Sequence, residues 1–144
     1  MVNNLKIKIN YHGTHELEQV EYGNWIDLYL AEDYDLEPGD FKLLSLGISM
    51  ELPEGYEAIM AERSSTFKNY GILQGNAIGV IDSSFCGDND IWHFPAFATK
   101  RVHLDKNTRI CQFRIQQSQP KINFIPVDSL GNEDRGGFGA HSGK

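Results

Sequence analysis

The chain has 144 residues, a formal net charge of −7 and 40% hydrophobic residues, enough for one domain without disulfide or metal staples. It has no apolar run of about 18 residues, so no membrane span is expected, and its N-terminus lacks the apolar core of a signal peptide. The acidic balance argues against binding to nucleic-acid backbones. Cys86 and Cys111 lack metal-ligand spacing, which predicts reduced thiols and a cytoplasmic protein.

Short strand-like runs separated by turns fill most of the chain. Alternating or briefly continuous apolar residues identify them. The runs cover residues 5–10, 25–30, 41–52 with a kink at Gly47, 56–61, 77–81, 91–98, 109–116 and 122–127. Pro95 inside one run indicates an edge strand or a bulge. Together they predict an all-β sandwich or barrel.

One short helix is expected within residues 64–70. A hydroxyl of Ser64 or Ser65 can cap its start, and Gly71 can end it. Free N–H groups at a helix start favour an anion such as phosphate, and Arg63 adds positive charge there. The alternative is an ordinary capped helix beside a surface arginine.

The composition changes at Gly131, after which nothing can build a core. Five glycines lie between Gly131 and Gly143. Successive glycines let backbone N–H groups surround an anion, Arg135 adds charge, and Phe138 can stack on a flat ligand. We therefore expect a β-barrel domain over residues 1–130 and a Gly-rich arm over residues 131–144, frayed or ordered only against something else.

Three further fragments carry polar chemistry. Asp82 follows a strand-like run, so it is either a turn residue bonded to its own backbone or a general base held at a strand end. Asp27 is an acid inside an apolar run, and Gln112 follows Arg109 by three residues on an expected strand.

Taken in chain order, the five segments around Asp27, Arg63, Asp82, Gln112 and Arg135 resemble the five motifs of the trimeric dUTP pyrophosphatases (dUTPases). Residues 53–56 and 130–137 are similar to the branch found in Gram-positive bacteria and their phages. The resemblance implies a distorted jelly-roll, β-barrel-like subunit with one short helix. It also implies a homotrimer whose active sites are shared between subunits, with the C-terminal arm of one chain closing over a site that others build.

The resemblance further implies Mg²⁺-dependent hydrolysis of dUTP to dUMP and pyrophosphate by in-line attack of water on the α-phosphorus. This reaction keeps uracil out of DNA and supplies dUMP. Asp82 would be the base that deprotonates the water. Asp27 would hold Mg²⁺ through coordinated water, so that a metal rather than a basic surface offsets the triphosphate charge.

The same resemblance assigns the substrate contacts. The phosphates would be held by Arg63, Ser64, Ser65, Gln112, Arg135 and Ser142, the uracil by Asn76 with Gly79 and Ile81, the deoxyribose by Phe85, and the closing ring would be Phe138. A residue after the third motif, His93, is the alternative for that ring.

The chain departs from the family pattern at a few positions. Phe85 stands where Tyr is usual, but the ring face alone excludes a 2′-hydroxyl. Asn107 and Thr108 replace a Gly-Asp turn, and Asn also tolerates a positive φ. An extra Ala140 precedes Ser142 in the fifth motif.

Two other functions are compatible with parts of this pattern. The dCTP deaminases resemble dUTPases in fold, but they need a glutamate on the strand after the third motif, and residues 90–98 contain none. A phage-type regulator that binds a protein partner under dUTP control is the alternative from another class, because an arm ordered by dUTP would alter a surface.

Overall fold

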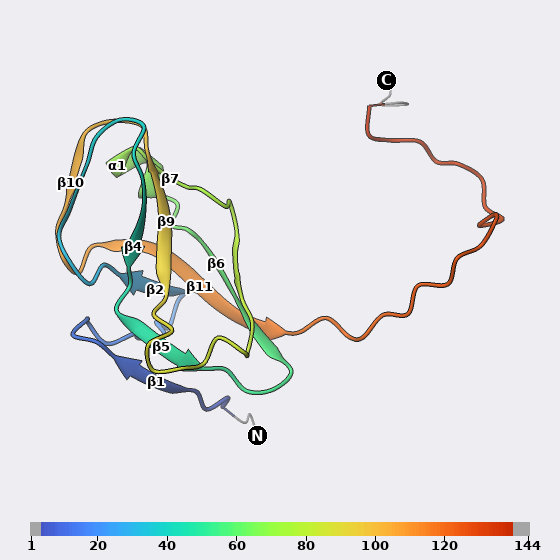
Figure 1. Ribbon diagram of the computed structural model, residues 1–144, viewed down its shortest axis with the longest axis horizontal. Helices are drawn as coiled ribbons and strands as arrows, with labels where there is room; N and C mark the ends of the chain where they lie inside the picture. Colours follow the sequence, from blue (N-terminus) through green and yellow to red (C-terminus); the bar gives the residue numbers. More distant parts are fainter. Residues whose placement is uncertain (1–3, 140–144) are drawn as a thin grey trace.

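The computed structural model describes residues 4–139, which form a β-rich body followed by a long extended segment (Figure 1). The elements in chain order are β1 (Lys8–Tyr11), β2 (Ile26–Tyr29), β3 (Tyr34–Leu36), β4 (Phe41–Ser45), β5 (Ile48–Glu51), β6 (Tyr56–Glu62), α1 (Thr66–Tyr70), β7 (Ile72–Gln74), β8 (Gly79–Ile81), β9 (His93–Ala98), β10 (Val102–Leu104) and β11 (Arg109–Gln117).

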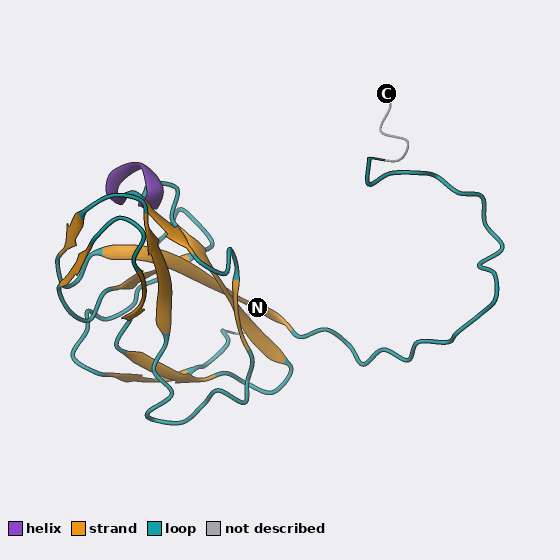
Figure 2. Ribbon diagram, turned by 45° about the horizontal axis from the view of Figure 1, so that its top comes forward, coloured by secondary structure: helices purple, strands orange, loops and turns teal. Residues whose placement is uncertain are grey.

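Four small antiparallel sheets enclose a single core (Figure 2). Their strand orders are β1-β5, β10-β3, β2-β11-β6-β8 and β4-β9-β7. Apolar side chains from all parts of the body fill the interior, and Leu28, Leu44, Ile48, Phe94 and Ile110 are each 0% exposed. The expected all-β architecture with one short helix is confirmed. No helix of residues 4–139 is long and apolar enough to cross a membrane.

Gly47 makes the kink that was expected between two strands. It joins β4 to β5 with φ 64°, a left-handed conformation that costs little only for glycine. A Cβ at this position would also lie 2.9 Å from the Cβ of Ala31. A positive φ, 70°, likewise occurs at Asn107, so the asparagine does sustain the turn before β11.

The expectation that Pro95 marks an edge strand is wrong. It lies in β9, the central strand of the β4-β9-β7 sheet. Its carbonyl accepts from the backbone N–H of Gly75 at 2.8 Å, and the nitrogen of a strand residue faces the same side as its carbonyl. On that side the register places Gly75 opposite Pro95, so the missing N–H leaves this pair with one hydrogen bond instead of two, and β7 ends at Gln74. The register with β4 is unbroken through Pro95, so there is no bulge either.

The strand expected over residues 122–127 is also absent. The chain leaves the body after β11 and extends away from it (Figure 1). Apolar side chains on this segment face solvent, with Phe124 85% and Ile125 76% exposed. A strand needs a neighbouring strand to satisfy its backbone groups, and the segment passes beside none in its own chain.

His103 on β10 makes two ionic hydrogen bonds, one to Asp35 on β3 and one to Asp105, which directly follows β10. Its Nδ1 lies 2.6 Å from Oδ1 of Asp35, and its Nε2 lies 2.9 Å from Oδ1 of Asp105. Both ring nitrogens can donate only when the imidazole is protonated. The two carboxylates, with Asp35 first, therefore raise the pKa of His103 above its ordinary 6.5.

This contact makes part of the stability depend on pH. Because the folded pKa is raised, the stabilisation is complete below about pH 6.5 and is lost as the pH rises through the folded pKa. We expect His103→Gln to lower the thermal midpoint more at about pH 5.5 than at about pH 9. An equal loss at both pH values, measured by circular dichroism, would contradict the contribution of the imidazolium.

Candidate functional site

Two groups of polar residues flank strand β6. The first lines a cavity of about 430 Å³ beside β8, here called the hairpin pocket. Its lining residues are Leu43, Met60, Asn76, Gly79, Val80, Ile81, Asp82, Ser84, Phe85, Ile91, Trp92, His93 and Pro95. The pocket therefore brings together Asn76, Gly79, Ile81, Asp82 and Phe85, to which the family resemblance assigns roles; those roles stay predictions.

Asp82 is an ionised carboxylate in this pocket. It directly follows β8, and the Ser84 hydroxyl and the Ser84 backbone N–H, at 2.8 Å, both donate to its Oδ1. These bonds, the hydroxyl first, lower the pKa of Asp82 below its ordinary value. Asp82 is thus a turn residue that accepts from the backbone two residues on, which was one of the two interpretations of the sequence. Its role as a general base stays a prediction.

The aromatic residues of the pocket have different roles. Trp92 is 1% exposed and packs edge-on against Phe113 with ring centroids 5.3 Å apart, so it belongs to the core. Phe85 is 40% exposed and offers a free ring face. His93 is exposed, and its Nδ1 lies 2.8 Å from the carbonyl oxygen of Ile91. Because a carbonyl can only accept, Nδ1 carries the proton in the neutral ring.

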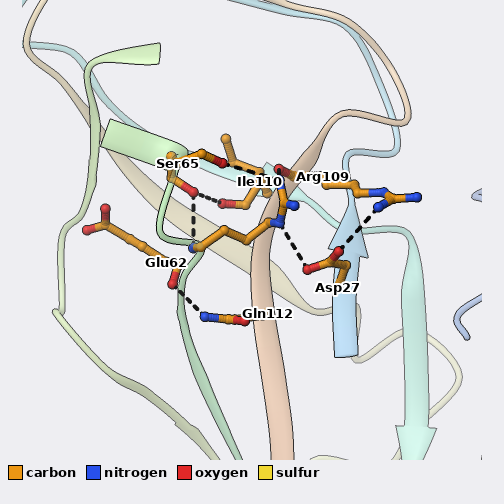
Figure 3. Close-up of polar contacts among 8 residues, drawn as sticks. Asp27, Glu62, Ser65, Arg109, Ile110 and Gln112 are labelled. Carbon is orange, nitrogen blue, oxygen red and sulfur yellow. Dashed lines mark hydrogen bonds and ion pairs between the residues drawn. The ribbon is translucent and has the colours of Figure 1, made fainter. Parts of the chain in front are cut away.

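The second group is the arginine cluster, formed by Asp27, Arg63, Ser65, Arg109 and Gln112. Figure 3 shows Asp27, Ser65, Arg109 and Gln112 side by side. Nε of Arg63 lies 3.0 Å from Oδ1 of Asp27, and Nη1 of Arg109 lies 3.6 Å from Oδ2. The Asp27 side chain is 28% exposed. One carboxylate thus neutralises only part of two guanidinium charges, which leaves the cluster suited to an anion.

A bulge in β11 sets the geometry of this cluster. Arg109 pairs with Tyr29 and Cys111 pairs with Leu28, so Ile110 is the extra residue. Ile110 and Cys111 are both buried, which shifts the in-out alternation by one residue. As a result Arg109 and Gln112 both lie on the less buried side, although residues three apart on a regular strand would face opposite sides.

The bulge also anchors the start of α1. The buried hydroxyl of Thr66 donates to the Ile110 carbonyl at 2.8 Å and accepts from the Arg63 backbone N–H at 3.1 Å. Ser65 makes no side-chain cap bond, so the expected serine cap is wrong. Ser65 is already helical, with φ −99° and ψ −3°, and its hydroxyl faces Nη1 of Arg63 at 3.5 Å. The Ser64 side chain is exposed.

Gln112 completes the cluster on β11. Its Nε2 donates to the backbone carbonyl of Glu62 at 3.0 Å, where β6 ends. Sequence reasoning missed Glu62 and Thr66 as supports of the cluster. Thr66 is 0% exposed. Its place as a polar residue at the start of a short helix, directly after Arg-Ser-Ser, could have indicated this supporting role.

The hairpin pocket and the arginine cluster lie near opposite ends of β6. Ile81, next to Asp82, pairs with Ala58, whereas Arg63 directly follows the end of β6 at Glu62. Arg63 follows Ala58 by five residue steps along the strand, a span of roughly 17 Å at about 3.4 Å per residue. Within one chain, Asp82 and Arg63 therefore do not form one compact site.

The remaining predicted contacts lie on the extended segment or beyond it. Arg135 and Phe138 are exposed and lie on the extended segment that leads away from the body (Figure 1), with Phe138 at φ 51°. Ser142 falls outside the described residues. Over residues 4–139, no three His, Cys, Asp or Glu side chains gather closely enough to hold a metal ion by themselves.

The fold and the two groups of residues define a β-barrel protein with a positively charged arginine cluster and an acid-bearing pocket. The dUTPase family model matches residues 25–143. The chain belongs to the dUTPase family.

Individual relatives agree with this assignment. The SPbeta prophage-derived deoxyuridine 5'-triphosphate nucleotidohydrolase YosS of Bacillus subtilis (strain 168) is 51% identical to this chain. The match covers 94% of this chain and 97% of the length of YosS. The deoxyuridine 5'-triphosphate nucleotidohydrolase of Thermoanaerobacter sp. (strain X514) is 36% identical, over 82% of this chain and 80% of its own.

Solved structures share the fold at low identity. A mutant dUTPase from phage phi11 of S. aureus, described with a structural Mg(II) ion, has a TM-score of 0.74 at 14% identity, over 89% of this chain and 99% of that chain. The dUTPase of Staphylococcus bacteriophage 80alpha, described as controlling transfer of virulence genes, has a TM-score of 0.73 at 14% identity, over 88% and 99%.

Proposed function

We propose that the protein hydrolyses dUTP to dUMP and pyrophosphate. The observation that carries the proposal is the placement of Asp82 in one pocket with Asn76 and Phe85, in a chain that belongs to the dUTPase family. We also propose a cytoplasmic location, which would place the enzyme with its nucleotide substrate.

In the proposed mechanism Asp82 accepts a proton from the attacking water. The oxygen of that water then attacks the α-phosphorus, and pyrophosphate leaves from the opposite side. The pKa of Asp82 lies below its ordinary value, so the carboxylate is ionised and able to accept a proton at neutral pH, as any exposed aspartate is.

The hairpin pocket would hold the nucleoside. Asn76 and the backbone of Gly79 and Ile81 would contact uracil, and the exposed face of Phe85 would pack on the deoxyribose. An added 2′-hydroxyl would meet that ring, which would exclude UTP.

The arginine cluster would hold the phosphates of a site completed by another subunit. Arg63, Ser64 and the backbone N–H of Ser65 would bind the phosphate chain, and Gln112 the α-phosphate. The span of roughly 17 Å along β6 supports a homotrimer with shared sites, since a neighbouring chain would bring its cluster to the Asp82 of this one.

The donor set near Asp27 fits Mg²⁺ held mainly by phosphates and water. Both carboxylate oxygens face arginines, so Asp27 would contact metal-bound water rather than the ion itself. Mg²⁺ commonly keeps several waters and binds through one or two carboxylates plus substrate phosphates. When bound, the ion would neutralise charge on the phosphates and orient them.

Residues 131–144 would form an arm that closes over a site. Arg135 and Ser142 would contact the γ-phosphate, and Phe138 would cover the base, with His93 as the alternative ring. The exposure of Arg135 and Phe138 in the single chain supports an arm ordered by another subunit and substrate. We propose catalysis as the primary function rather than partner-binding regulation, because the chain carries all five family motifs.

Pyrophosphate release from dUTP, dCTP, dTTP and UTP tests the proposed function. We expect release from dUTP alone, lost when EDTA removes the metal. Release of ammonia from dCTP would instead indicate a deaminase. No reaction with any of the four nucleotides would favour the regulatory alternative, which a pull-down with a non-hydrolysable dUTP analogue would then examine.

Asp82→Asn removes the base while keeping the side-chain shape. We expect kcat for dUTP to fall by about 10²–10⁴, the usual contribution of a positioned base, with dUTP affinity and the unfolding midpoint little changed. Turnover near that of the unmodified protein would refute the role of Asp82.

Deleting residues 135–144 tests the arm. We expect the truncated protein to keep its fold and assembly state, because the core lies upstream, and to lose about tenfold or more in kcat/KM. Phe138→Ala in the full chain is the matched control for the ring alone. Full activity after truncation would overturn the arm and favour His93 as the covering ring.

A further inference from the structure

Asn76 lines the hairpin pocket and is held from behind by a buried amide. Gln74, the last residue of β7, is 5% exposed. Its Nε2 donates to Oδ1 of Asn76 at 2.9 Å and to the backbone carbonyl of Met60 at 3.1 Å. The Met60 carbonyl belongs to β6, an inner strand of the four-stranded sheet. The hydrogen bonds through Gln74 therefore link this strand to Asn76 in the pocket.

The Met60 carbonyl fixes the direction of both side-chain amides. A carbonyl only accepts, so the nitrogen of the Gln74 amide must face it. That nitrogen has two hydrogens, and the second one is donated to Asn76. The Asn76 oxygen therefore faces Gln74, and its Nδ2, which has no hydrogen-bond partner among residues 4–139, remains as a donor.

The backbone around Asn76 is fixed separately. The Gly75 N–H donates to the Pro95 carbonyl at 2.8 Å, and the Ala77 N–H donates to the Gln74 carbonyl at 3.0 Å. Ala77 has φ 61°, which places the turn in one defined conformation. With the main chain held, the rotation of the Asn76 amide is the freedom that Gln74 removes.

Packing alone does not account for a glutamine at this position. Its Oε1 is buried without a hydrogen-bond partner in the described part of the chain. A buried carbonyl without a partner destabilises the fold, and an apolar side chain of the same length would avoid that cost. The donating nitrogen is the feature that such a side chain would lack.

We propose that Gln74 is a positioning residue for base selection: it orients Asn76 so that the pocket presents an N–H donor to the base. The proposal rests on the proposed function and deepens it. Uracil has an acceptor, O4, where cytosine has an amino donor, N4. A donor on Asn76 therefore matches dUTP and opposes dCTP, whereas a freely rotating amide would accommodate both.

Gln74→Met tests the proposal with a side chain of similar length and no donor. The readout is the ratio of the Kd values for the α,β-imido analogues of dUTP and dCTP, measured by calorimetry on the full chain. We expect the preference for the uracil analogue to fall by about 10- to 100-fold. We expect kcat for dUTP to stay near its original value, because Asp82 is untouched.

A double-mutant cycle separates positioning from packing. In an Asn76→Ala background, Gln74→Met should leave base preference unchanged, because no amide remains to orient. Equal effects of Gln74→Met in both backgrounds would show that Gln74 acts independently of Asn76 and would overturn the proposal. If the Gln74→Met variant fails to fold, Gln74→Leu is used in its place.

Asn76→Asp tests the orientation directly at an exposed position. One carboxylate oxygen can still accept from Gln74, and the other then presents an acceptor to the base. We expect the preference to shift toward the cytosine analogue, and a retained uracil preference would contradict the proposal.

If the unmodified protein fails to hydrolyse dUTP, the proposed function has failed. If it hydrolyses dUTP selectively and Gln74→Met keeps that selectivity, the Gln74 proposal alone has failed.

Discussion

The position of β6 between β11 and β8 is the constraint on which the rest of the structure depends. Its backbone pairs with β11 from Tyr56 to Glu62 and with β8 from Ala58 to Met60. The strand therefore cannot shift relative to either neighbour without breaking both ladders. The hairpin pocket lies on its β8 side, and the arginine cluster follows its C-terminal end. Strand β6, paired on both sides, thus keeps the proposed base and the proposed phosphate-binding residues of one chain apart.

The charges of the arginine cluster depend on one partly buried carboxylate. Asp27 lies on β2 opposite Gln112, and it holds Arg63 and Arg109 in place before any anion is present. The buried Cys111 thiol behind it has a strongly raised pKa, first through burial and then through the Asp27 charge. That thiol therefore stays neutral, which excludes it as a nucleophile and leaves the cluster to electrostatic binding.

Local pattern predicted the long strands, and the family resemblance pointed to the pocket residues, but neither gave the features that depend on strand pairing. The three-residue strands β3, β7 and β10 are too short for a clear alternation. Pro95 suggested an edge because a sequence does not show where the neighbouring strand stops. The bulge at Ile110 was equally hidden, since an extra residue is defined only against a partner strand. Asp82 was found because its turn chemistry is local.

The segment after β11 shows how a correct local pattern can give a wrong element. Residues 122–127 are mostly apolar, as in a short strand, yet in this chain Phe124 and Ile125 remain largely exposed. Burying such side chains is worth roughly 25 cal/mol per Å², and their backbone groups also need partners. The proposed trimer would supply both from a neighbouring subunit. The same sequence would then carry the Gly-rich arm, with Arg135 and Phe138, toward a site that its own barrel does not complete.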